Sequence, residues 1–189
     1  MTEVIKQPNH RWLRFSLRTF LIVITILTVC FGWWVYRAER QRAAVRWVKE
    51  NGGTVYYDFE FDSEGVFAQN RQSPVPEWLL NILDVNYFSN VVYLNISGPQ
   101  VTDLTPLADL TNLNTLAFIR TPISDLKPST GITNLVWSSL QDNANQVSDL
   151  TPLAGLTNLK GLYLFLTQVS DEEIVRLQQA LPNCDIVEY

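Results

Sequence analysis

A chain of 189 residues with 47% hydrophobic residues can form one folded domain or two, and its formal net charge is −5. The charge is unevenly spread: residues 1–18 and 37–50 each carry a net +3, whereas residues 51–189 carry five basic and sixteen acidic residues, a net −11. Such an acidic region argues against a nucleic-acid partner, because contacts to phosphate require clustered lysine and arginine.

Residues 19–36 form a run of 18 residues without a charge, bracketed by Arg18 and Arg37. About 20 apolar residues span the hydrocarbon core of a bilayer, so this run predicts a transmembrane helix in contact with lipid. A buried core helix would keep a polar face, and no small-residue cleavage site follows the run. The sequence therefore predicts a single-pass signal anchor in the cell membrane, behind a basic N-terminal tail at 1–18.

The orientation of this helix stays open. Four basic residues precede the run and five follow it, so the positive-inside rule gives nearly equal counts. A short basic N-terminus before a single anchor favours a cytoplasmic N-terminus, and hence a repeat domain outside the cytoplasm.

Residues 37–53 predict a juxtamembrane helix with apolar pairs Ala43–Trp47 and Ala44–Val48 and a stop at Gly52-Gly53. Its basic side chains have two interpretations that stay open, contact with anionic headgroups and an ordinary solvated face.

Residues 54–90 are predicted to cap the first end of the repeats. They read as a strand over 54–61, a loop, and a short helix that starts at Pro76. The candidate core residues of this cap are Trp78, Leu79, Ile82 and Leu83.

One phrase recurs after residue 90. It begins at Val101, Ile123, Val147 and Val169, with spacings of 22, 24 and 22 residues, and a second phrase, T-N-L, lies between the copies. A fixed period in the twenties with leucine at set offsets is typical of a leucine-rich repeat solenoid. The predicted fold class is α/β: a transmembrane helix, then repeats over 91–169 with a parallel sheet on the concave face and short helical turns on the convex face.

The turns of the repeats have their own chemistry. Asp103, Asp125, Asp149 and Asp171 are expected to accept backbone N–H groups. A threonine before proline, as at Thr105 and Thr151, is expected to cap each helical turn. A calcium ladder is the alternative for the aspartates, but the glycine-rich nonapeptide of calcium-binding β-rolls is absent, so no metal is predicted.

The third repeat is irregular. Ser129 and Ser138 replace leucine, and two residues are inserted near Ala144, either as tolerated irregularity or as a binding loop. Residues 170–189 are predicted to be the C-terminal cap, with a capping box at Ser170 and Glu173. The apolar stripe of its helix is Ile174, Leu177, Ala180 and Leu181.

The segment from Ser148 to Leu159, S-D-L-T-P-L-A-G-L-T-N-L, resembles the 22-residue repeats of the internalin type. The whole chain is similar to short bacterial membrane-anchored leucine-rich repeat proteins, on R-F-S-L-R-T at 14–19, A-A-V-R-W-V-K-E-N-G-G-T-V-Y-Y at 43–57 and L-Q-Q-A-L-P-N-C-D-I at 177–186. This resemblance implies a solenoid behind a membrane helix. The asparagine that usually follows each strand is kept only at Asn143 and is replaced by Pro99, Thr121 and Thr167.

Residues that alternate with the inward leucines are expected on the concave face. The candidate binding residues are Tyr93, Asn95, Thr115, Ile119, Arg120, Trp137, Ser139, Gln141, Tyr163 and Phe165. Aromatic side chains on a rigid curved sheet favour a protein or peptide partner, and scattered surface aromatics are the simpler alternative.

The predicted function is therefore a membrane-anchored protein- or peptide-binding module without a cofactor. The alternative is a structural envelope component with no specific ligand. Enzymatic activity is a third class, which the sequence does not favour. Its single histidine, His10, precedes the membrane run, and no Ser-His-Asp set, P-loop or G-x-G-x-x-G motif occurs.

Overall fold

The computed structural model describes residues 16–62, 65–68, 71–142 and 147–188. The chain divides into two compact units, residues 1–36 and residues 37–189. Most of the predicted basic tail lies outside the described residues, as do His10, Asn143 and the insertion near Ala144.

Helix α1 (Leu17–Glu50) begins in the first unit and continues into the second. In the first unit it is long and apolar enough to cross a membrane, and none of the apolar window is buried within the protein. The hydroxyls of Thr25 and Thr28 donate to the carbonyls of Leu21 and Ile24 at 2.9 and 2.8 Å, so the helix itself satisfies these polar groups. This segment is a candidate membrane span or signal anchor.

The last turns of α1 belong to the hydrophobic core of the second unit. Ala44, Val45 and Val48 are buried there, and Trp47 packs against them. The predicted pair Ala44–Val48 therefore lies on the buried face, whereas Ala43 is exposed. The end of α1 therefore helps to cover the core at the first end of the sheet. This role was predicted for residues 54–90.

Gln41 joins α1 by hydrogen bonds to the segment that leads into the second strand. Its Nε2 donates to the Ser89 carbonyl at 2.8 Å and to Asn86 Oδ1 at 3.0 Å, and its Oε1 accepts the Val91 N–H at 3.3 Å. A buried amide must satisfy both its donor and acceptor groups, and these bonds do so for Gln41.

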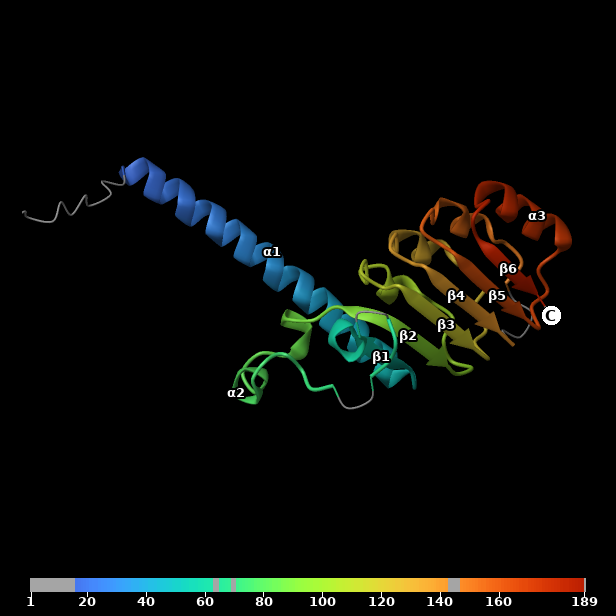
Figure 1. Cartoon of the computed structure of the whole chain (residues 1–189), viewed down its shortest axis with the longest axis horizontal. Coiled ribbons are helices and arrows are strands. Elements are labelled where there is room, and N and C mark those ends of the chain that lie inside the picture. The colour runs from blue at the N-terminus through green and yellow to red at the C-terminus, as the bar shows by residue number, and fades with distance from the viewer. Residues whose placement is uncertain (1–15, 63–64, 69–70, 143–146, 189) are drawn as a thin grey trace, which may run out of the picture. The chain divides into compact units, whose positions relative to one another are not determined.

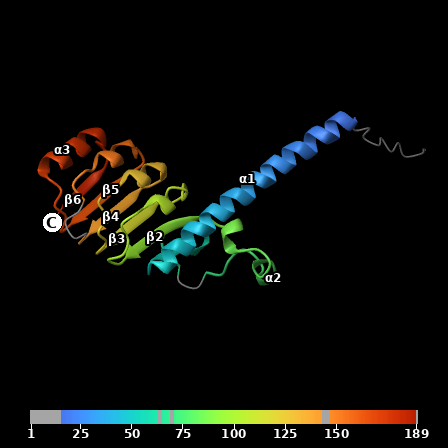
Figure 2. The same cartoon turned by 180° about the vertical axis from the view of Figure 1, so that it is seen from behind.

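The strands form one sheet in the order of the sequence (Figures 1 and 2). They are β1 (Thr54–Tyr57), β2 (Val91–Ser97), β3 (Thr115–Ile119), β4 (Trp137–Gln141), β5 (Gly161–Phe165) and β6 (Asp185–Glu188). Strand β1 is antiparallel to β2, and every later pair is parallel. Sequential parallel strands joined by short turns confirm the predicted leucine-rich repeat fold.

Short helical turns lie along one side of the sheet, together with α3 (Figures 1 and 2). The helical elements after α1 are η1 (Asp58–Glu60), α2 (Glu77–Leu80), η2 (Val85–Tyr87), η3 (Thr105–Leu107), η4 (Lys127–Gly131), η5 (Thr151–Gly155) and α3 (Asp171–Ala180). Strand β1 is shorter than the predicted 54–61, because the chain turns into η1 after Tyr57, whose N–H donates to the Glu60 carboxylate at 2.6 Å.

The inward side chains of the strands stack in register to form the core. Leu94, Leu116, Ser138 and Leu162 make one row, and Ile96, Phe118, Leu140 and Leu164 make the next; all are buried. Both serines of the irregular third repeat are buried as well. The hydroxyl of Ser129 donates to the Leu126 carbonyl at 2.5 Å, which offsets the cost of burying it.

Three of the four aspartates of the repeated phrase accept a backbone N–H of the following turn, as predicted. Their Oδ1 atoms accept the backbone N–H two residues later, at 2.8 Å for Asp103, 2.9 Å for Asp125 and 2.9 Å for Asp149. The hydroxyl and the backbone N–H of Thr105 hold the pKa of Asp103 below its ordinary value. Thr151 lowers the pKa of Asp149 in the same way.

The prediction that a threonine hydroxyl caps each turn was wrong. Leu104 and Leu150 occupy the N-cap positions, without a side-chain cap. Each threonine is the first helical residue instead, since the aspartate has already taken its N–H. Asp171 also differs from the other aspartates: it begins α3, whose cap is Ser170.

A ladder of asparagines in the T-N-L phrase joins successive repeats and was not predicted from the sequence. Asn134 Nδ2 donates to the Thr111 carbonyl at 2.8 Å, and Asn158 Nδ2 donates to the Thr133 carbonyl at 2.9 Å. In the first repeat, Asn112 Nδ2 donates to Asn90 Oδ1 at 2.7 Å. The recurrence of T-N-L was the available signal.

Two predicted core residues of the N-terminal cap are exposed. Trp78 is 64% exposed and Ile82 is 72% exposed, whereas Leu79 and Leu83 are partly buried. The physical reason is that α1 supplies Ala44, Val45 and Val48 to this end of the core, so α2 is not needed to cover it.

In the C-terminal cap, Leu177 and Leu181 are buried and Ile174 is partly buried, but Ala180 is exposed. The capping box is half formed. Ser170 Oγ accepts the Glu173 N–H at 3.4 Å, while the Glu173 carboxylate pairs with Arg176 at 2.6 Å.

Candidate functional site: the concave face of the sheet

The face of the sheet opposite the inward leucines carries the predicted binding residues, and we call it the concave face. Strand pairing aligns its side chains in rows that cross the sheet. One row is Tyr93, Thr115, Trp137 and Gly161; the next is Asn95, Ala117, Ser139 and Tyr163; the third is Ser97, Ile119, Gln141 and Phe165. Most of these side chains are partly or fully exposed, in alternation with buried neighbours.

Three aromatic rings form a cluster at the C-terminal half of this face. The rings of Trp137 and Tyr163 have centroids 6.1 Å apart and planes 15° apart. The corresponding values for Tyr163 and Phe165 are 6.2 Å and 5°. The rings are therefore nearly parallel, and Trp137 keeps 41% of its surface exposed. We call this set the Trp137 cluster.

Gly161 makes room for the Trp137 ring. A Cβ at this position would lie closer to Trp137 Cζ3 and Cε3 than the 3.0 Å that real Cβ atoms keep. The two residues face each other in the register of β4 and β5. The indole thus lies over the backbone of β5, and Gly161 is buried beneath it.

A second group of rings lies at the N-terminal end of the face. Tyr93 contacts Tyr56 edge-on at a centroid distance of 5.4 Å and lies 6.5 Å from Phe61. Phe67 contacts Tyr56 at 4.9 Å and Phe61 at 5.9 Å. Of these four only Tyr93 was a predicted site residue. The other three belong to the cap, and the aromatic run T-V-Y-Y-D-F-E-F was the signal that could have found two of them.

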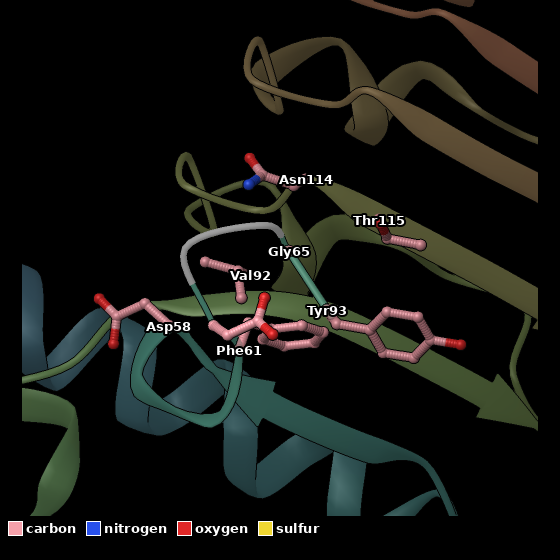
Figure 3. A pocket seen from close by; sticks show the side chains of 8 residues that line it. Asp58, Phe61, Gly65, Val92, Tyr93, Asn114 and Thr115 are labelled. Carbon is pink, nitrogen blue, oxygen red and sulfur yellow. The ribbon is translucent and has the colours of Figure 1, made fainter. Parts of the chain in front are cut away.

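A cavity of about 340 Å³ opens beside these rings (Figure 3). Its lining comes from the segment after β1, from β2 and from the start of β3: Asp58, Phe61, Asp62, Gly65, Val92, Tyr93, Asn114 and Thr115. Two aromatic residues and two aspartates therefore line one cavity, together with the concave-face residue Thr115.

The charged candidate Arg120 forms an ion pair at the margin of the face. Its Nε lies 3.2 Å from Asp142 Oδ2, and both side chains are largely exposed. Arg120, Asp142 and Leu166 each follow a strand directly, and all three have positive φ, at 56°, 48° and 52°. The chain thus leaves three successive strands by the same left-handed turn, which places Arg120 beside its partner one repeat later.

Polar candidates lie between the two ring groups, beside the apolar Ile119. Gln141 Nε2 donates to Ser139 Oγ at 3.0 Å. Asn95 Oδ1 is buried and accepts no hydrogen bond from the described part of the chain. No group of three or more His, Cys, Asp or Glu side chains within the described residues is placed to hold a metal ion.

No family model matches the chain, and none of the curated proteins matches it. Solved structures that it resembles include two internalins of Listeria monocytogenes. The chain is 41% identical to internalin C2, over 47% of its own length and 37% of that protein, with a TM-score of 0.41. It is 24% identical to the internalin inlF, over 48% of its own length and 33% of that protein, with a TM-score of 0.33.

The chain thus spans about a third of the length of these internalins. The expected resemblance to internalin-type repeats is confirmed. The fold itself rests on the strand order and the repeat register described above.

Proposed function

We propose that the protein is a membrane-anchored leucine-rich repeat module that binds a protein or peptide partner on its concave face. The Trp137 cluster carries this proposal: three nearly parallel rings stand on adjacent strands of a rigid sheet. Tryptophan and tyrosine supply large contact area at low conformational cost, and they dominate the energetics of many interfaces.

The size of the face favours a peptide or a short segment of a protein. Six strands at a spacing of about 4.8 Å, each about five residues of 3.3 Å, give roughly 500 Å² of sheet face. A standard interface buries about 800 Å² on each partner. An extended segment that contacts the ring groups and the residues between them would use the whole face.

Anchoring by residues 19–36 is part of the proposal, with the repeats outside the cytoplasm. The exposed apolar surface of α1 supports it, because such a surface is stable only when lipid or protein covers it. Protease treatment of intact cells and spheroplasts tests the orientation. Digestion of residues 51–189 from outside is expected, and protection of that region would contradict it.

A comparison of three variants tests the binding face. Photo-crosslinking in cells, with the full chain as bait, is expected to capture a partner that Trp137→Ala and Tyr163→Ala lose. Trp78→Ala is the matched control, because Trp78 is 64% exposed and lies outside the face. An equal yield from all variants would refute the concave face, and no captured partner with the wild-type chain would favour the structural alternative.

A further inference from the structure

We infer that the cavity beside Phe61 and Tyr93 receives a lysine or arginine side chain of the partner, so that the bound segment is basic. This inference rests on the proposed function, because it specifies the partner of the same face. The cavity lies at the opposite end of the face from the Trp137 cluster, and its lining includes Tyr93 and Thr115 of the row that reaches Trp137.

The chemistry of the lining suits a cation. Phe61 and Tyr93, whose ring centroids lie 6.5 Å apart, line the cavity together with Asp58 and Asp62. Asp62 Oδ1 accepts the Val66 N–H at 2.8 Å, which is a bond from a neutral group. A guanidinium or ammonium group is attracted by the face of an aromatic ring and by a carboxylate together. Neither interaction is available to an anionic side chain.

No lysine or arginine lines the cavity within the described residues. The hydrogen bonds of Asp58 come from neutral groups: the N–H of Phe59 at 2.9 Å, and the N–H and Nδ2 of Asn90 at 3.2 and 3.0 Å. The nearby Arg37 donates from Nη2 to Asn90 Oδ1 at 2.8 Å.

Arg71 is the other cation of this region. It donates to the Phe61 carbonyl at 2.7 Å and is not part of the lining. The surrounding sequence has the same bias, since residues 51–189 carry a net −11. A basic segment would therefore be attracted to this end of the face before it makes contact.

The size and position of the cavity limit how it can be filled. About 340 Å³ is near the lower end of the roughly 300–1,000 Å³ of small-molecule sites, which suits one long side chain. Tyr93 and Trp137 lie in one row, two strand spacings or about 10 Å apart. An extended segment that fills the cavity and packs on Trp137 would therefore place a basic residue about two to four positions from a large apolar residue.

Peptide display tests this inference on the full chain in detergent or a nanodisc. Random dodecapeptides are selected on the wild-type protein, and those whose binding requires Trp137 are kept. The enriched peptides are expected to contain lysine or arginine two to four residues from an aromatic or large aliphatic residue. Replacing that arginine by citrulline, which has the same shape without the charge, is expected to weaken binding about three- to tenfold.

Protein variants give a second measurement. Asp58→Asn and Asp62→Asn are each expected to reduce the preference for arginine over citrulline. Glu172→Gln, which removes one exposed charge from α3, is expected to keep it. Because Asp58 also holds the Asn90 amide, circular dichroism checks the fold, and the arginine–citrulline comparison on the wild-type chain stands without any variant.

The two proposals fail in different ways. If no peptide is enriched, or if Trp137→Ala leaves binding unchanged, recognition on the concave face is refuted. If peptides bind and depend on Trp137, but lack a basic residue or bind equally with citrulline, only the cation site is refuted.

Discussion

Gly161→Ala tests the contact between the Trp137 ring and the backbone of β5. The added Cβ would overlap the indole, so the ring must move away from β5. Exposing about 50–100 Å² of apolar contact costs roughly 1–2.5 kcal/mol, and losing the parallel ring pair costs a further 0.5–1.5 kcal/mol or so. Replacing glycine in a strand returns about 0.5–1 kcal/mol. A net destabilisation of about 1–3 kcal/mol is expected.

The same substitution in a Trp137→Ala background is the control, because the overlap is then removed. Gly161→Ala is expected there to be neutral or to stabilise by up to about 1 kcal/mol. Urea unfolding of the four chains in detergent, followed by circular dichroism, gives the coupling between the two sites. Equal destabilisation in both backgrounds would refute the contact.

Three further predictions concern the fold. Asn134→Ala removes the bond to the Thr111 carbonyl and is expected to cost about 0.5–1.5 kcal/mol in urea unfolding, whereas the exposed Asn183→Ala should change little. Val48→Ala is expected to cost about 1–3 kcal/mol, and Lys49→Ala close to zero, if the end of α1 belongs to the core; equal effects would contradict that assignment. The lowered pKa values of Asp103 and Asp149 give stability that is present above their unfolded value near 3.8 and lost as pH falls through the folded value. An Asp103→Asn, Asp149→Asn double variant should therefore lose less stability in an acid titration than the wild-type chain.

The repeat itself was predictable because each position is set by a local rule. Leucines two apart in a strand share a face, so the inward rows followed directly from the period. The aspartates also followed, since a carboxylate two residues before a turn N–H is a local motif. The prediction for Thr105 was wrong because Asp103 and Thr105 can both cap the same turn. The sequence alone does not show which of the two side chains does so.

The caps were less predictable because their partners are distant in sequence. Nothing in the sequence around Trp78 shows that α1 already fills the core at that end, so its apolar character was taken for burial. The cavity depends on the same kind of contact. Asp58 and Phe61 line one cavity with Asn114 and Thr115, because the sheet places the segment after β1 and the start of β3 on either side of β2.

The proposed anchor and the small area of the concave face are linked through the local concentration of the partner. A contact of about 500 Å², with a few ring contacts and one charge, is expected to reach only micromolar affinity, since much of the gross gain offsets the entropy of association. A partner held on the same surface as the anchored chain meets it at an effective concentration that can approach 1 mM. With a Kd of about 100 μM, such a partner would be bound roughly nine-tenths of the time. Under the proposed anchoring, a short solenoid is sufficient, because a membrane anchor at residues 19–36 would raise the local concentration and the concave face would need only modest affinity.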